Sequence, residues 1–176
     1  LADATEGDAD RAIDALAAEF HARVPRDRCK AVGAIYARYS TRHQDSIEDQ
    51  VRAMLEEAAR RGVFVPRAHI CHDRAVRGCT NRRPGLDRLR GILDRRGAVD
   101  VVLVFATNRL SRKSYKAVQF VEEEIVEKGV RCIFAASGVD TADKNWRMLL
   151  QAHSMTDEAV VAMGSAHVRA ALEGLF

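Results

Sequence analysis

A serine surrounded by arginines is the feature of this sequence that most directly suggests chemistry. Ser40 follows a short apolar segment and stands two residues after Arg38. A serine hydroxyl is a weak nucleophile unless a neighbour removes its proton or the charge developing on the electrophile is stabilised. Three more arginines follow at the ends of later apolar segments: Arg83, Arg109 and Arg112. Convergent guanidinium groups neutralise phosphate oxygens without a metal, so this combination indicates attack on a phosphoryl centre.

Other arrangements of nucleophiles and ligands fit the sequence less well. The chain has no G-x-S-x-G motif, and His43 is the only histidine adjacent to Ser40, so a hydrolase triad is disfavoured. A serine that stood alone would more often be a helix cap or a turn residue. Zinc prefers thiolate and imidazole ligands, and the local set is His69, Cys71, His72 and Cys79. Alternate residues of a strand point to opposite faces, which is poor geometry for one shared ion, so we expect free thiols and no metal cofactor.

The arginines are concentrated in one part of the chain. The net charge is only +3, from 28 basic and 25 acidic residues. Residues 74–96, however, contain eight arginines and two aspartates. A polyanion is a plausible partner for this stretch, although a solvated basic helix face would have the same composition. If the polyanion is DNA, as the resemblance described below implies, the candidate DNA-binding residues are Arg77, Arg82, Arg88 and Arg95.

Length and composition indicate one globular domain. The 176 residues are 47% hydrophobic, 30% charged and 6% aromatic, which is typical of a folded chain with one core. No apolar run approaches the roughly 20 residues of a membrane-spanning helix. The acidic start lacks the basic and apolar regions of a signal peptide, so we expect a soluble, cytoplasmic protein.

The hydrophobic pattern alternates short strands with amphipathic helices. We expect strands at 31–37, 63–71, 101–105 and 130–135, and helices at 10–23, 46–61, 85–96 and from about 114 to Gly129. Ser46 and Asp49 form a capping-box pattern at the start of the second helix. Residues 73–84 have the composition of a polar loop, and 107–113 that of a turn. A longer helical pattern runs from Trp146 to about Leu172. This order predicts a doubly wound α/β domain, whose sites lie at the carboxyl ends of parallel strands.

Several short motifs resemble, in order and spacing, the catalytic domain of the serine recombinases, the resolvase/invertase family. They are Tyr36-Ala-Arg-Tyr-Ser-Thr41, Ser46-Ile-Glu-Asp-Gln50, Arg83-Pro-Gly-Leu86, Asn108-Arg-Leu-Ser-Arg112 and Gly138-Val-Asp-Thr141. The resemblance covers about residues 31–172 and implies a three-layer α/β domain with a mainly parallel sheet. The large serine recombinases are one branch of this family. A long extension of the chain after Phe176 would identify this protein as a member of that branch.

The resemblance implies an enzyme that exchanges DNA strands without a metal or nucleotide cofactor. Ser40 would attack a DNA phosphodiester and form a 5′-phosphoserine link. Arg38, Arg83, Arg109 and Arg112 would bind and activate the phosphate, and Gln50 would support the pocket. The long helix after Trp146 would mediate dimerisation, with a tetramer in the synaptic complex. The expected units are an N-terminal extension with one helix (1–30), the catalytic domain (31–142) and the long C-terminal helix (143–176).

Two positions depart from the family pattern. Arg77 stands before Gly78 where the family usually has serine, and Asn108 replaces the usual aspartate before Arg109. These changes predict a slow or conditionally active enzyme. Two other functions stay open: a non-catalytic relative that binds DNA or joins an active recombinase, and a flavodoxin-like ligand-binding module. The second lacks a glycine-rich phosphate loop to support it.

Overall fold

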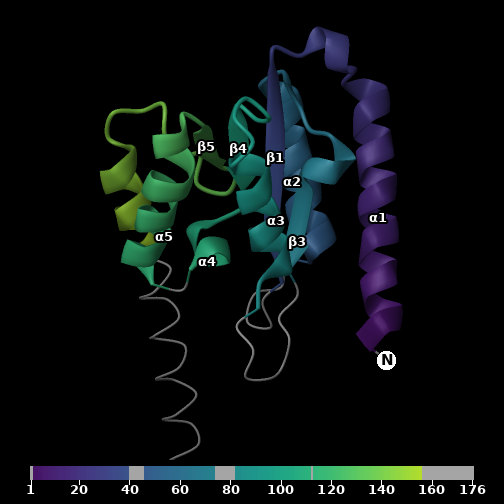
Figure 1. The fold of residues 1–176 in the computed structure, drawn as a ribbon, viewed down its shortest axis with the longest axis horizontal. Helices are drawn as coiled ribbons and strands as arrows, with labels where there is room; N and C mark the ends of the chain where they lie inside the picture. Colours follow the sequence, from purple (N-terminus) through teal and green to yellow (C-terminus); the bar gives the residue numbers. More distant parts are fainter. Residues whose placement is uncertain (1, 40–45, 74–81, 112, 156–176) are drawn as a thin grey trace, which may run out of the picture.

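A parallel sheet lies between two layers of helices in the computed structural model, which describes residues 2–39, 46–73, 82–111 and 113–155 (Figure 1). The strands are β1 (Ala31–Arg38), β2 (Val63–Phe64), β3 (Ile70–Asp73), β4 (Val101–Val104) and β5 (Arg131–Phe134). The long strand β1 pairs with β4 on one side and with β2 and β3 on the other, and β4 pairs with β5. Because all these pairings are parallel, the strands end at the same edge of the sheet, which we call the carboxyl edge.

Helices cover both faces of the sheet. They are α1 (Ala2–Arg23), α2 (Ile47–Arg60), α3 (Pro84–Leu93), α4 (Thr107–Leu110) and α5 (Ser114–Phe120). Successive side chains of β1 point to opposite faces, so Ile35 and Ala37 pack with α1 and α2, whereas Ala34 and Tyr36 pack with α3 and α5. This architecture confirms the predicted α/β fold. None of the described helices is long and apolar enough to span a membrane.

The predicted strand over 63–71 is wrong in its middle. The chain forms β2, then a 3-10 helix at Arg67–His69, and only then β3, which continues to Asp73. Pro66 is the physical reason, because it has no amide hydrogen to donate to β1 and its φ is fixed near the observed −62°.

Several helices also differ from the prediction, and α3 ends at Leu93 instead of residue 96. The first helix begins at Ala2 instead of residue 10. The predicted turn at 107–113 contains the short helix α4. The predicted helix up to Gly129 comprises α5, a π-helical turn at Val121–Ile125 and a 3-10 turn at Val126–Lys128, and it ends where Gly129 adopts a φ of 77°. Of the predicted long helix, residues 146–155 are helical and the rest lies outside the described residues.

The N-cap half of the predicted capping box is present at the start of α2, and a bond between the two side chains accompanies it. The Asp49 amide donates to Ser46 Oγ at 3.0 Å, and Ser46 Oγ donates to the Asp49 carboxylate at 2.8 Å. This cap sets the first turn of α2, and the position of that turn fixes where Gln50 lies.

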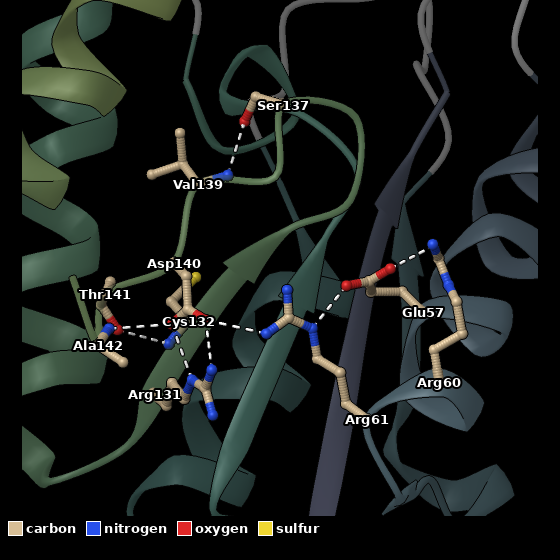
Figure 2. A network of polar contacts seen from close by, with 10 residues as sticks. All are labelled: Glu57, Arg60, Arg61, Arg131, Cys132, Ser137, Val139, Asp140, Thr141 and Ala142. Atoms are coloured by element: carbon tan, nitrogen blue, oxygen red, sulfur yellow. Dashed lines mark hydrogen bonds and ion pairs between the residues drawn. The ribbon is translucent and has the colours of Figure 1, made fainter.

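A network of ion pairs closes the amino edge of the sheet, opposite the ends of the strands (Figure 2). Arg131 and Arg61 both reach Asp140, at 2.7 Å from Arg131 Nε and 3.0 Å from Arg61 Nη1, and Arg61 also pairs with Glu57. Burial alone would raise the pKa of Asp140, but its hydrogen bonds with Arg131 and Ala142 and the nearby charges lower it. Residues 139–141 run antiparallel beside β5 and hold Asp140 in place. This edge is thus fixed from three elements.

Candidate active site

Side chains from four elements meet at the carboxyl edge. The end of β1 provides Arg38, and the first turn of α2 provides Gln50. The short helix α4, which follows β4, provides Asn108 and Arg109. Arg83 stands directly before α3. The described residues that we predicted as catalytic are therefore brought to one edge of the sheet, whereas Ser40 and Arg112 lie outside the described residues.

Gln50 fixes the end of β1. Its Oε1 accepts a hydrogen bond from the Arg38 amide at 3.4 Å, and its Nε2 donates to the Arg38 carbonyl at 3.2 Å. Gln50 is fully buried, so both bonds are made out of contact with water. A side-chain amide that satisfies both backbone groups of one residue holds that residue much as a neighbouring strand would. The backbone is thus set two residues before Ser40.

Arg38 connects β1 to α4. Its Nη2 donates to the main-chain carbonyl of Asn108 at 3.1 Å. The side-chain Oδ1 of Asn108 is buried and accepts no hydrogen bond from the described residues. A buried acceptor of this kind is costly unless something donates to it, so the described residues leave one hydrogen bond of Asn108 unmade.

The guanidinium of Arg83 forms most of its hydrogen bonds within the protein. Its Nε and Nη2 donate to the Tyr36 hydroxyl at 3.2 and 2.8 Å, Nη2 also donates to the Arg109 carbonyl at 2.7 Å, and Nη1 donates to the Leu110 carbonyl. These carbonyls lie at the C-terminal end of α4, where cationic groups are favoured. A guanidinium has five N–H groups, so the bonds of Arg83 within the described part of the chain use four of them.

Tyr36 and Asp73 form a buried polar centre that the sequence analysis did not identify as part of the site. The Tyr36 hydroxyl donates to Asp73 Oδ2 at 2.7 Å while it accepts from Arg83. Burial is the main cause that raises the pKa of Tyr36, so the phenol stays neutral and keeps its donor hydrogen. Tyr36 begins one of the recombinase-like motifs, and Asp73 begins the predicted polar loop. A hydrogen bond between residues 37 positions apart can be identified only in the folded sheet.

Asp73 also caps α3 from a different element. Its carboxylate accepts from the Gly85 amide at 2.7 Å and from the Leu86 amide at 3.0 Å. Arg83 occupies the N-cap position but gives the helix no side-chain cap, so Asp73 satisfies amides that would otherwise be orphaned. One carboxylate thereby fixes both the start of α3 and, through Tyr36, the orientation of Arg83.

Arg109 is buried in the interior of the site. Only 2% of its surface is exposed, and its guanidinium carbon lies 5.9 Å from the centre of the Phe105 ring. Charge interactions are stronger where water is excluded, so a phosphate that reaches Arg109 is stabilised more than it would be at the surface.

The predicted DNA-binding arginines lie along α3 at different distances from the site. Arg82 is exposed beside Arg83, Arg88 is exposed at mid-helix, and Arg95 is exposed beyond the far end of α3. A helix of ten residues is about 15 Å long, so Arg95 is not brought to the carboxyl edge. Arg77 lies outside the described residues.

The cysteine and histidine set does not form a metal site in the described part of the chain. Cys71 packs toward α3, whereas His72 points to the opposite face. Burial raises the pKa of Cys71 to about 11, so its thiol stays protonated and is a poor metal ligand. No group of three metal-binding side chains occurs among the described residues, and Cys79 lies outside them.

Comparison with known proteins identifies the family to which the chain belongs. A parallel three-layer domain with arginines gathered at its carboxyl edge is matched over residues 33–174 by the family model "Resolvase, N terminal domain". The chain belongs to this family, the serine recombinases of the resolvase/invertase type, as the motifs predicted. Among curated protein sequences no match was found.

Two solved structures show the same fold. The N-terminal catalytic domain of TP901-1 integrase is 25% identical, with a TM-score of 0.57 over 75% of this chain and 98% of that one. A resolvase family site-specific recombinase from Streptococcus pneumoniae is 20% identical, with a TM-score of 0.59 over 82% of this chain and 99% of that one. The second comparison supports the fold alone.

Proposed function

We propose that this domain catalyses site-specific DNA strand exchange through a covalent serine link. Ser40 Oγ attacks a DNA phosphodiester, the Oγ–P bond forms as the P–O3′ bond breaks, Oγ loses its proton and O3′ gains one. The product is a 5′-phosphoserine link and a free 3′-hydroxyl. Strand exchange then precedes the reverse reaction, in which a 3′-hydroxyl attacks the phosphoserine and releases Ser40.

The gathering of arginines beside the strand end that precedes Ser40 is the observation that carries this proposal. Arg38 stands at the end of β1, and Arg109 stands in α4, which follows the neighbouring strand β4. Both Arg38 and Arg83 donate to main-chain carbonyls of α4 at this edge. Phosphoryl transfer needs in-line positioning and neutralisation of the equatorial oxygens, which guanidinium groups provide. We assign phosphate binding to Arg38, Arg109 and Arg112, and to the remaining N–H of Arg83. Gln50 holds the nucleophile's backbone.

The experiment that tests the proposal is the chemical identification of the linked residue. The protein is incubated with a nicked DNA substrate that prevents religation, and adducts that survive denaturant are digested and sequenced by mass spectrometry. We expect a nucleotide remnant on Ser40, attached through the 5′-phosphate. A remnant on another residue, or a 3′-phosphate linkage, would contradict the mechanism.

Asn108 favours a second candidate, a weakened relative that binds DNA or assembles with an active recombinase. An aspartate can give or take a proton near the leaving oxygen, whereas an amide can only form hydrogen bonds. The side-chain Oδ1 of Asn108 is buried and receives no hydrogen bond from the described residues. The two candidates differ in one observable, because only the first predicts covalent capture of DNA.

Restoring the family residues is expected to accelerate cleavage. We expect the double variant Asn108→Asp, Arg77→Ser to cleave a supercoiled substrate at least about tenfold faster than the wild type, equivalent to about 1.4 kcal/mol of barrier. The two single variants separate the contributions of the proton-transferring group and of the added cation. A wild type that is already the fastest of the four proteins would show that both residues are adaptations of an active enzyme.

Binding to non-specific DNA is expected to depend steeply on salt. Arg82, Arg88 and Arg95 present exposed guanidinium groups, and removing an arginine that binds one phosphate should reduce the slope of log affinity against log salt by about 0.9. We therefore expect a flatter slope when all three are replaced by alanine. Because Arg82 adjoins the site and Arg95 does not, the single Arg82→Ala variant should have the larger effect. Equal slopes for the wild type and the triple variant would show that these three arginines form a solvated face and do not bind DNA.

We also propose that the helix beginning near Trp146 mediates self-association. Its described part exposes apolar side chains that a monomer leaves in water: Met148 at 66%, Met155 at 59% and Leu149 at 37%. A modest interface has a dissociation constant of roughly tens of micromolar, so sedimentation at that protein concentration should detect a dimer or larger species. Met148→Glu with Met155→Glu should return the monomer, whereas Tyr115→Glu on α5 should not. A wild type that stays monomeric at millimolar concentration would contradict this assignment.

A further inference from the structure

Helix α1 lies outside the family match, yet it belongs to the core of this protein. The family model begins at residue 33, and the TP901-1 integrase domain is covered almost completely by three quarters of this chain. Ile13, Ala17 and Phe20 of α1 are buried in the same apolar cluster as β1 and α2. Figure 1 shows α1 extending along the side of the domain formed by α2 and β3. An element added to the family fold is thus packed beside a strand that leads into the site.

The polar contacts of α1 converge on the segment that contains β3. Asp10 Oδ1 lies 3.1 Å from His72 Nε2 and 3.2 Å from Arg67 Nη2. Asp14, one turn further along α1, contacts Arg67 but not His72. The hydrogen bonds from His72 and Arg67, with the charge of Arg67, outweigh burial and lower the pKa of Asp10. An ionised carboxylate can only accept, so His72 carries its proton on Nε2 and donates to Asp10.

His72 is the point where α1, β3 and α3 meet. Its side chain is 9% exposed, and its Nδ1 is buried without a hydrogen-bond partner in the described part of the chain. Asp10 therefore supplies its one polar contact there. On the backbone side, the His72 carbonyl lies directly against Gly85, where a Cβ atom would come within 2.2 Å of the carbonyl oxygen. The next residue is Asp73, which caps α3 and holds Tyr36.

Strand β3 needs such a contact because it is short and lies at the edge of the sheet. It pairs with β1 through four residues and has no strand on its outer side in the described structure. Its alternating side chains point to opposite faces, so a rotation that moves His72 on the α1 face also moves Asp73 on the α3 face.

We propose that Asp10 is a positioning residue: by holding His72, it fixes β3 so that Asp73 keeps α3, Tyr36 and Arg83 in their places at the site. Asp10 touches no substrate in this scheme and acts entirely through His72. The effect on DNA cleavage rests on the proposed function, whereas the coupling between α1 and Asp73 does not.

Amide hydrogen exchange tests the coupling independently of activity. The measured quantity is the exchange rate of the Gly85 and Leu86 amides, which donate to Asp73, relative to that of the Leu103 amide in the middle of β4. We expect Asp10→Ala to raise this ratio about tenfold through local opening, and Asp10→Asn, which keeps an acceptor but loses the charge, to raise it about threefold. Asp14→Ala and Asp14→Asn are matched controls, because they remove a carboxylate from the same helix without touching His72, and we expect ratios within about twofold of wild type.

Two further readouts separate positioning from general destabilisation. The ¹⁵N shifts of the His72 ring report which nitrogen is protonated, and the Nε2–H signature should weaken in the Asp10 variants only. The rate of covalent DNA capture should fall about tenfold in Asp10→Ala and stay near wild type in Asp14→Ala, since small misplacements in a site reduce rates strongly. Should Asp10→Ala not fold, the Asp10→Asn and Asp14→Asn pair decides the question.

The proposal is overturned if the Asp10 variants leave the exchange ratio unchanged, or if the Asp14 variants change it equally. If the wild type captures no DNA but the exchange ratio behaves as expected, the proposed function fails and the coupling stands.

Discussion

Replacing Ser40 with alanine is expected to abolish the denaturant-resistant adduct between this protein and DNA. The change removes the proposed attacking oxygen, so no Oγ–P bond can form, while the arginines proposed to contact phosphate remain. Non-covalent binding should therefore stay within about twofold of wild type, because counterion release from the phosphate contacts is unchanged. The measurement combines a denaturing gel with a binding titration on the same substrate.

Ser46→Ala is the matched control for this result. It removes a serine hydroxyl six residues after Ser40. The loss of this N-cap of α2 should cost about 1 kcal/mol of stability. Its adduct should still form, although more slowly because the lost cap loosens the turn that positions Gln50, and this separates loss of the nucleophile from loss of stability. An adduct that persists in Ser40→Ala would exclude Ser40 as the nucleophile.

The second large effect is expected at Asp73. Asp73→Ala leaves the Gly85 and Leu86 amides and the Tyr36 hydroxyl buried without their acceptor, and each such group costs about 1–3 kcal/mol. Because these costs are not strictly additive, we expect the free energy of unfolding to fall by about 3–5 kcal/mol in urea denaturation. Asp73→Asn should lie between, since it keeps one of the two accepting oxygens.

Asp100→Ala provides the comparison for Asp73. The Asp100 carboxylate accepts one backbone amide, from Val32 at 2.8 Å, at an exposed position on the opposite edge. Its loss should cost only about 1 kcal/mol, because water can replace the missing acceptor. If Asp73→Ala were no more destabilising than Asp100→Ala, the buried centre would not have the role described for it.

The sequence predicted the layers of the fold and the edge of the sheet at which the described candidate residues lie. Alternating short apolar runs and helical stripes fix the order of strands and helices, and the carboxyl ends of parallel strands must then meet. The Ser46–Asp49 cap was predictable because it is local. Pro66 is visible in the sequence, but the apolar residues on both sides of it led us to predict one continuous strand. The π-helical turn at Val121–Ile125 has no recognisable sequence signal.

The polar organisation of the site could be predicted only in part. Residue types and order indicated which arginines gather, but not what each one contacts. Arg83 illustrates the limit, because four of its bonds go to Tyr36 and to two carbonyls of α4, which are groups that no spacing rule identifies. The role of Asp73 likewise depends on the tertiary approach of α3 to β3.

Both outer edges of the described sheet are closed to a further strand. On the β5 side, residues 139–141 already occupy the Phe134 amide and the Cys132 carbonyl. On the β2 and β3 side, Pro66 and the 3-10 helix interrupt the edge, and His21 of α1 binds the Val65 carbonyl at 2.8 Å. A continuous free edge would let copies of the protein join strand to strand and aggregate when they are concentrated on one DNA site. With both edges blunted, contacts between copies are left to helices, whose packing can be broken and re-formed without unravelling the sheet.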